Sequence, residues 1–373
     1  MAHGLITDDA LAQLQARIGK PISRVTPPFY TEVNGDAARR FGFAIGDDNP
    51  LWHDPAYGQA SVWKTQLAPP TILYSTDNVA SGAVEGLPGV HAMFAGTNWT
   101  WHAPVAVGTR IRTEVVLKDL VIRKTRFAGR SVQQIYHVGF RDQEDRLIAE
   151  AESWCFRTQR DTAREEGEKY EEKLFETYRY DDAEIERFAK HYLTEKPRGA
   201  EPRYWEDVSV GDELDTVLKG PYTVTAAVAF MQAWGSYAVA NHRQAWTYYD
   251  RHPKLANRNE NNVPEPPVRV HWSEAFAREV GVPGAYDFGP ERIAWLGHLV
   301  TDWIGDAGFL KNLNVQIRDH NLVGDATWCK GKVSRKDVVA GEHLVECQIA
   351  AENQHGKITA LGTATARLPS RGV

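Results

Sequence analysis

The spacing of apolar side chains predicts helices at the start of the chain and strands further on. Apolar positions in residues 5–19 and 37–45 recur at helical intervals, and Thr7 with the two aspartates after it is a helix-start signal. Residues 71–82 follow two prolines and end on glycine, so they are predicted to form a central helix. Alternation of apolar and polar residues then predicts three antiparallel strands, at residues 110–117, 134–140 and 147–155.

The second half of the chain repeats this order. The apolar run after Thr225, which we expect to cap it, predicts one helix. Residues 290–305 predict another, because Pro290 suits a first turn and Gly305 an end. Alternating segments predict three more strands, at residues 326–333, 342–351 and 357–367. Each half is therefore predicted to wrap a curved antiparallel sheet around one helix.

Two stretches of the chain also resemble each other in sequence. Residues 41–74 and 270–306 align without a gap, which places Trp52 on His271, and a second pair of blocks matches later in each half. Self-similarity that persists in the same order indicates an internal duplication.

The change in composition between the two similar halves suggests where the domains end. We predict a first domain at residues 1–157, a charged helical linker at 158–200 and a second domain at 201–373. The second domain carries an insertion, residues 237–270, that has no counterpart in the first. Loops of this length in compact domains are usually functional or disordered.

The two similar stretches carry a family resemblance. The run GDDNPLWHD, residues 46–54, resembles the GDxNPLHxD signature of the MaoC-like, (R)-specific enoyl-CoA hydratases. Residues 271–289, HWSEAFAREVGVPGAYDFG, resemble the segment of that family that runs from its catalytic histidine to the glycine of its oxyanion site. The pairing is similar to mycobacterial-type two-part 3-hydroxyacyl dehydratases, in which a degenerate hotdog partners a catalytic one. The resemblance implies an α+β double hotdog and a hydro-lyase acting on acyl-CoA thioesters.

The residues that the family uses for catalysis are divided between the halves of this chain. In the resembled hydratases an Asp and a His five residues apart, with an Asn between them, hold the water. The first half keeps Asp47 and Asn49, but Trp52 stands at the histidine position and His53 is displaced by one. The second half keeps His271, whereas its Gly-Asp pair has become Gly-Ser. Neither half has an intact pair.

Three arrangements could follow. His271 could act with Asp287, which lies two residues before Gly289, or Asp47 and His53 could form a shifted pair. Alternatively no pair exists and the protein only binds. By analogy with the family, the backbone N–H of Gly289, at the start of a helix, would stabilise an enolate on the thioester oxygen.

A CoA ester also needs cations for its phosphates and a cover for its acyl group. The basic candidates for the phosphates are Arg318, Arg123, Lys124 and Arg126. The aromatic residues of the insertion could cover an acyl pocket, or the insertion could be a surface decoration or a dimer contact; these residues are Trp246, Tyr248 and Tyr249.

Composition narrows the remaining possibilities. A chain of 373 residues with 42% apolar residues has room for two cores, and its net charge of −6 without a Lys/Arg block argues against nucleic-acid and membrane partners. Three cysteines without CxxC spacing argue against disulfides and zinc. The N-terminus shows no signal-peptide pattern, so we expect a cytoplasmic protein. We also expect a homodimer, because the sheet edges and helices of such units usually pair again. No cofactor is expected beyond the CoA of the substrate.

Three functions are compatible with these patterns. We favour reversible hydration of a 2-enoyl-CoA, which is also the dehydration of a 3-hydroxyacyl-CoA. The first alternative is a non-catalytic acyl-CoA-binding subunit that needs a partner. The second is an acyl-CoA thioesterase. The sequence has no GxSxG, HExxH, P-loop or GxGxxG run, which argues against serine hydrolases, zincins, NTPases and Rossmann enzymes.

Overall fold

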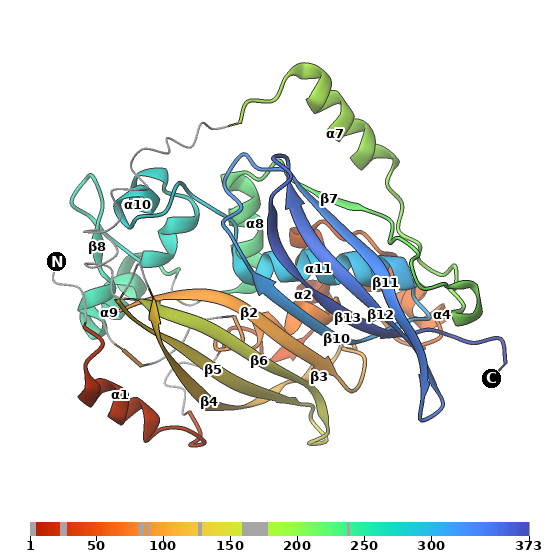
Figure 1. Cartoon of the computed structure of the whole chain (residues 1–373), viewed down its shortest axis with the longest axis horizontal. Helices are drawn as coiled ribbons and strands as arrows, with labels where there is room; N and C mark the ends of the chain where they lie inside the picture. Colours follow the sequence, from red (N-terminus) through yellow and green to blue (C-terminus); the bar gives the residue numbers. More distant parts are fainter. Residues whose placement is uncertain are drawn as a thin grey trace.

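The described part of the chain is built around a nine-stranded antiparallel sheet, ordered β4-β5-β6-β2-β10-β13-β12-β11-β7 (Figure 1). The computed structural model describes residues 5–22, 28–81, 86–87, 90–125, 129–158, 178–236 and 239–372. The strands from the first half are β2 (His91–Trp101), β4 (Arg112–Thr125), β5 (Gly129–Arg141) and β6 (Leu147–Thr158). Those from the second half are β7 (Val217–Lys219), β10 (Phe309–Ile317), β11 (Thr327–Val339), β12 (Glu342–Asn353) and β13 (Ile358–Arg367).

The two halves share this sheet because β2 pairs with β10. Asn98 lies opposite Asn314 in the antiparallel register, and the Asn312 side-chain amide donates to Asn98 Oδ1 at 2.9 Å and to the Trp99 carbonyl at 2.6 Å. On the other side of β10, Gly362 of β13 leaves no room for a side chain, since a Cβ would lie 1.8 Å from the Asn314 carbonyl oxygen. The sequence predicted two sheets side by side, whereas the structure joins them edge to edge.

Helix α11 (Gly289–Ile304) is the predicted central helix of the second half, and nearly all of its residues are buried. It packs against β2 of the first half as well as β7 and β10 to β13 of the second. In Figure 1 it runs across the sheet, with α2 (Gly35–Ile45) and α8 (Val224–Trp234) beside it. The site described below lies where α2 and α11 meet.

The central helix predicted for the first half is much shorter. A 3₁₀ helix, η1, covers only Pro70–Ser75, and turns follow as far as residue 81. Asp77 ends the helical pattern because its Oδ1 accepts the backbone N–H groups of Val79 at 2.8 Å and Ala80 at 3.3 Å. An aspartate that bonds its own backbone in this way competes with the helical hydrogen bonds.

The duplication is visible in the ends of two helices. Helix α2 ends at Gly46 and α8 at Gly235, both in the left-handed conformation that glycine adopts easily, with φ of 64° and 72°. The two helices pack against each other. The cap of α8 is Thr223 and not the predicted Thr225. The Gly46-Asp47 and Gly235-Ser236 dipeptides thus occupy corresponding places in the two halves.

Other helices lie outside the shared sheet. They are α1 (Asp8–Gln15), α3 (Pro50–His53), α4 (Pro55–Ala60), α7 (Asp182–Thr194), α9 (His242–Arg251) and α10 (Glu274–Glu279). Helix α7 belongs to the predicted linker, of which residues 159–177 lie outside the described part. In the insertion, Tyr249 of α9 is buried, whereas Trp246 is exposed.

All three cysteines are free and buried. Among the described residues, no helix has both the length and the apolar character needed to cross a membrane.

Candidate active site

The first-half motif forms a compact turn between α2 and α3. The Asp47 carboxylate accepts the backbone N–H of Asn49 at 3.2 Å, and the Asn49 side-chain oxygen accepts that of Leu51 at 2.9 Å. Pro50 takes the first position of α3. These bonds are the usual capping contacts of Asp and Asn. Both side chains are nonetheless only 3% exposed, so they also face the second half.

The second half supplies a histidine for Asp47. His298, on α11, places Nε2 3.7 Å from Asp47 Oδ1, and its side chain is 6% exposed. That separation is too long for a direct hydrogen bond and short enough for one water molecule to contact both groups. The predicted alternative partner, His53, bonds instead to the backbone carbonyl of Asp47 through Nε2 at 2.8 Å. Asp47 and His53 therefore meet, but not through the carboxylate.

Lys219, at the end of β7, completes this buried cluster. Its ammonium group lies 2.8 Å from His298 Nδ1, 2.7 Å from the Ile45 carbonyl and 2.9 Å from the Gly46 carbonyl. The Asp47–His298–Lys219 cluster thus draws one residue from the first half and two from the second.

Burial shifts the titration of all three groups in the cluster. Burial raises the pKa of Asp47 to about 7, although Lys219 and the Asn49 backbone act in the opposite direction. Burial, helped by the Lys219 charge, holds the pKa of His298 well below its usual range. Burial also lowers the pKa of Lys219, against the attraction of Cys329 and Asp47. A carboxyl with a pKa near neutrality beside a neutral imidazole is suited to acid–base chemistry.

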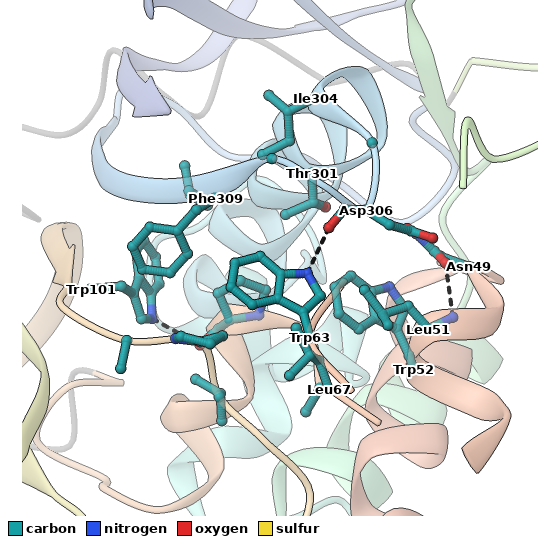
Figure 2. Close-up of a pocket in the computed structure, with 18 residues that line it drawn as sticks. Asn49, Leu51, Trp52, Trp63, Leu67, Trp101, Thr301, Ile304, Asp306 and Phe309 are labelled. Atoms are coloured by element: carbon teal, nitrogen blue, oxygen red, sulfur yellow. Dashed lines mark hydrogen bonds between the residues drawn. The ribbon is translucent and has the colours of Figure 1, made fainter. Parts of the chain in front are cut away.

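An apolar pocket adjoins the cluster (Figure 2). It contains about 460 Å³ of space between atoms, including the part that opens to solvent. Asn49 and Thr301 form its polar wall, and each is within one helical turn of a cluster residue along the chain. Most of the remaining wall is aromatic or aliphatic, and the larger contributors are Trp52, Trp63, Leu67, Trp101, Ile304 and Phe309.

Asp306 fastens the two halves together at the rim of this pocket. Its carboxylate accepts the Asn49 side-chain amide at 2.8 Å and the Tyr57 hydroxyl at 2.6 Å, and its backbone carbonyl accepts the Trp63 indole N–H at 2.6 Å. Figure 2 shows this contact between Trp63 and Asp306. These bonds engage the polar groups of Asn49, Asp306 and Trp63, and the Thr301 hydroxyl bonds to carbonyls of its own helix, so the space that remains suits an apolar group.

His271 lies at the other end of the molecule's central helix, near the start of α11. Its Nδ1 donates to the Tyr286 carbonyl at 2.9 Å, and its ring packs on that of Phe288 with centroids 3.9 Å apart. Burial lowers the pKa of His271 to about 4, so the ring is neutral at physiological pH. A neutral ring that donates through Nδ1 leaves Nε2 as its basic nitrogen.

Asp287, the carboxylate predicted to assist His271, is held by a different residue. Arg292 donates to both of its carboxylate oxygens, one of them at 2.7 Å, and Asn321 approaches it at 3.4 Å. The Asp287 side chain is fully buried. The structure therefore gives Asp287 a buried ion pair and not a contact with the His271 ring through its carboxylate.

Gly289 begins α11, as the sequence predicted, and its α-carbon lies directly against the first half. A Cβ at this position would come 2.2 Å from Cδ1 of Phe94 on β2. Packing alone therefore requires glycine here, whether or not its N–H binds a substrate oxygen.

We expect Gly289→Ala to lower the free energy of unfolding by about 1–3 kcal/mol, as overpacking usually does. The cause would be the contact with Phe94, so in a Phe94→Ala background the same change should cost less than about 0.5 kcal/mol. Denaturant unfolding of the four proteins of this cycle measures the difference. An equal cost in both backgrounds would show that Phe94 is not the reason for the glycine.

Comparisons with known proteins agree with this architecture. Residues 18–151 match the model of the FAS1-like dehydratase domain region. A UPF0336 protein of Streptomyces avermitilis is 27% identical over 100 residues, which make up 26% of this chain and 65% of that relative's length. A solved structure called a MaoC-like dehydratase covers 96% of this chain and 99% of its own, with a TM-score of 0.66 and 18% identity.

A protein of Mycobacterium tuberculosis described as having a double hotdog fold has a TM-score of 0.55 and 11% identity, and covers 94% of this chain and 96% of its own. The chain has the fold of these MaoC-like and double-hotdog structures, and its residues 18–151 match a dehydratase family model. The predicted α+β double hotdog is confirmed, and the dehydratase match agrees with the predicted family. The matched residues 18–151 contain Asp47 and Asn49.

The cationic residues predicted to bind CoA phosphates come from different halves of the chain. Arg318, after β10, and Arg123, on β4, are both exposed, and their strands are four positions apart in the sheet, or about 19 Å. Lys124 follows Arg123 in β4, and its side chain is not among the described ones. Arg126 lies outside the described residues. Arg123 and Arg318 thus belong to separated strands of the sheet, and a phosphate-binding role for either stays a prediction.

The sequence did not identify His298 or Lys219 as site residues. Each interrupts an apolar segment, His298 within the buried helix 290–305 and Lys219 at the end of Val-Leu-Lys before a Gly-Pro turn. A polar residue in such a place is a usable signal, because buried polar groups need partners. The identity of the partner comes only from the fold.

Proposed function

We propose that this chain is a hydro-lyase that adds water to a 2-enoyl thioester and removes it from a 3-hydroxyacyl thioester, with CoA as the thiol carrier. The observation that carries the proposal is the Asp47–His298 pair, which sits between the two halves beside an apolar pocket. At 3.7 Å the two groups are close enough for one water molecule to contact both.

The two groups have complementary roles in hydration. Asp47 removes a proton from the water as its oxygen attacks C3 of the enoyl group, and His298 donates the proton that C2 receives. Dehydration is the reverse. The thioester oxygen carries the developing negative charge between these steps, and a helix N-terminus stabilises such a charge.

The adjoining pocket supports an apolar acyl group as the substrate's tail. Its walls are mainly indole, phenyl and aliphatic groups, and the Asn49 amide and the Trp63 indole N–H are both bonded to Asp306. A hydroxyl or carboxylate placed there would lose its water without gaining a partner, which is unfavourable by about 1–3 kcal/mol for a neutral group.

His271 is the second candidate for the proton-transferring residue. Its neutral imidazole and its position by Gly289 favour it, while its carboxylate neighbour Asp287 is bound to Arg292. The homodimer, the cytoplasmic location and the lack of a separate cofactor remain predictions from the sequence.

The test is the loss of enoyl-thioester absorbance in a panel of 2-enoyl-CoA substrates. We expect the native protein and His271→Gln to consume substrate, and His298→Gln to be slower by at least about 100-fold, as for the loss of a general acid. The two histidine variants are matched controls for one another, since each removes one imidazole from the second half.

Other outcomes would identify the alternatives. A loss of activity confined to His271→Gln would move the chemistry to the start of α11. Release of free CoA thiol would indicate a thioesterase. Binding of CoA esters with no turnover would indicate a binding subunit, and the hydro-lyase proposal would then fail for this chain.

A further inference from the structure

Lys219 is the described lysine whose ammonium group touches a histidine of the proposed site. Its three N–H groups have three acceptors within 2.9 Å, namely the carbonyls of Ile45 and Gly46 and Nδ1 of His298. An ammonium group has three donors and no acceptor. Lys219 is therefore fully satisfied although it is only 6% exposed.

This arrangement determines which nitrogen of His298 carries the hydrogen. In its charged form Lys219 can only donate, so Nδ1 of His298 then accepts, and the proton of the neutral ring sits on Nε2. Nε2 is the nitrogen that faces Asp47. In this tautomer the ring can give a proton toward the substrate but cannot take one from water.

We infer that Lys219 is a positioning residue that fixes His298 as the proton donor and leaves Asp47 as the base. The inference rests on the proposed function, since the roles are those of a hydration reaction. It adds a residue that acts through His298 without touching the substrate.

The cluster also balances its protons over a full turnover. In hydration, Asp47 takes a proton from water, the C3–O bond forms, and the Nε2 proton of His298 passes to C2 as Lys219 returns a proton to Nδ1. The products of this step are a neutral lysine, a neutral aspartic acid and an imidazole protonated on Nδ1. The Asp47 proton then passes to Nε2 and the Nδ1 proton to Lys219, which restores the starting state without an external acid.

The charges that surround Lys219 suit this exchange. Asp47, Glu195, Asp302 and the Cys329 thiol all face it and raise its pKa, while burial, the largest effect, lowers it. The pKa of Asp47 is raised at the same time. The two shifts bring the lysine and the aspartate closer in proton affinity than they are in water, which eases transfer between them.

Lys219 could instead serve only to cap the carbonyls at the end of α2. Lys336 offers a matched control for that role, because its ammonium group donates to the carbonyls of Trp205 and Val208, the first at 2.7 Å, and these contacts involve no titratable group. A purely structural lysine should behave like Lys336 when it is replaced.

The first experiment determines the tautomer of His298 in the unaltered protein. The chain is labelled with ¹⁵N-histidine, and the His298 signals are assigned by their absence in His298→Gln. We expect a protonated Nε2 and an unprotonated Nδ1 at neutral pH. A protonated Nδ1 would overturn the inference, and this result would leave the hydro-lyase activity itself unaffected.

The second experiment compares Lys219→Met with Lys336→Met. We expect Lys219→Met to lower kcat by about 100-fold with little change in KM. Because the pKa of Lys219 is lowered, the rate of the native protein should fall at a pH below the ordinary pKa of lysine, and Lys219→Met should lack this fall. Lys336→Met should keep the native kcat and pH profile. If both variants keep them, the inference fails while the proposed function stands; if the native protein has the expected tautomer but no turnover, the proposed function fails.

Discussion

Asp47→Asn is expected to lower kcat by about 10²–10⁴-fold, the usual contribution of a general base. The amide keeps the oxygen that accepts the Asn49 backbone N–H, so the turn between α2 and α3 should persist. What it loses is the capacity to take a proton from water. Steady-state hydration of the best 2-enoyl-CoA in the panel measures the change, and circular dichroism checks the fold.

The pH profile provides a second reading of the same variant. Since burial raises the pKa of Asp47 to about 7, the native rate should increase as pH rises through that value and the carboxylate forms. The residual rate of Asp47→Asn should lack this rise. The adjacent Asp48 is exposed, so Asp48→Asn is the matched control and should keep both the rate and the profile. A rise that persists in Asp47→Asn would mean that another group is the base.

Arg292→Met is expected to lower the free energy of unfolding by about 3–5 kcal/mol, the usual cost of breaking a buried ion pair. Arg292 joins α11 to three other places, through Asp287 and through the carbonyls of Asp319 at 2.7 Å and Thr359 at 3.0 Å. Its removal would leave a carboxylate with no exposed surface and no cation. Denaturant unfolding at neutral pH measures the loss.

An exposed pair in the same half serves as the control for this prediction. Arg278 and Glu274 form an (i, i+4) ion pair on α10 with 59% and 52% of their side chains exposed. Arg278→Met should cost less than about 1 kcal/mol, as exposed pairs usually do. Similar costs for the two variants would show that the Asp287–Arg292 pair contributes no more than a surface contact.

The elements that the sequence predicted well are those whose pattern is local. Helix α11 has its proline and glycine at the expected ends, and the strands β5, β6, β11, β12 and β13 follow the alternation of their side chains. The first-half helix was predicted too long because Asp77 forms its own turn, which no periodicity reveals. The sequence also did not predict that β2 pairs with β10, since pairing between strands that are distant in sequence depends on the whole fold.

The residues of the candidate site likewise fall into those that the sequence identified and those that it missed. Asp47 and Asn49 stand in a contiguous motif, and sequence alone was sufficient to select them. His298 and Lys219 come from the second half and meet Asp47 only once α11 and β7 have packed beside α2. The sequence offered His271 and His53 as the catalytic histidine, because a motif is read along the chain and not across an interface.

Because the Asp47–His298–Lys219 cluster takes residues from both halves, the two halves of the duplicated chain are not interchangeable. Two copies of the first half would bring two aspartates and neither His298 nor Lys219. Two copies of the second would bring the histidine and the lysine, with Ser236 where Asp47 stands in the other half. Neither half alone carries all three groups, so a symmetric dimer of either half could not supply the proposed acid–base pair.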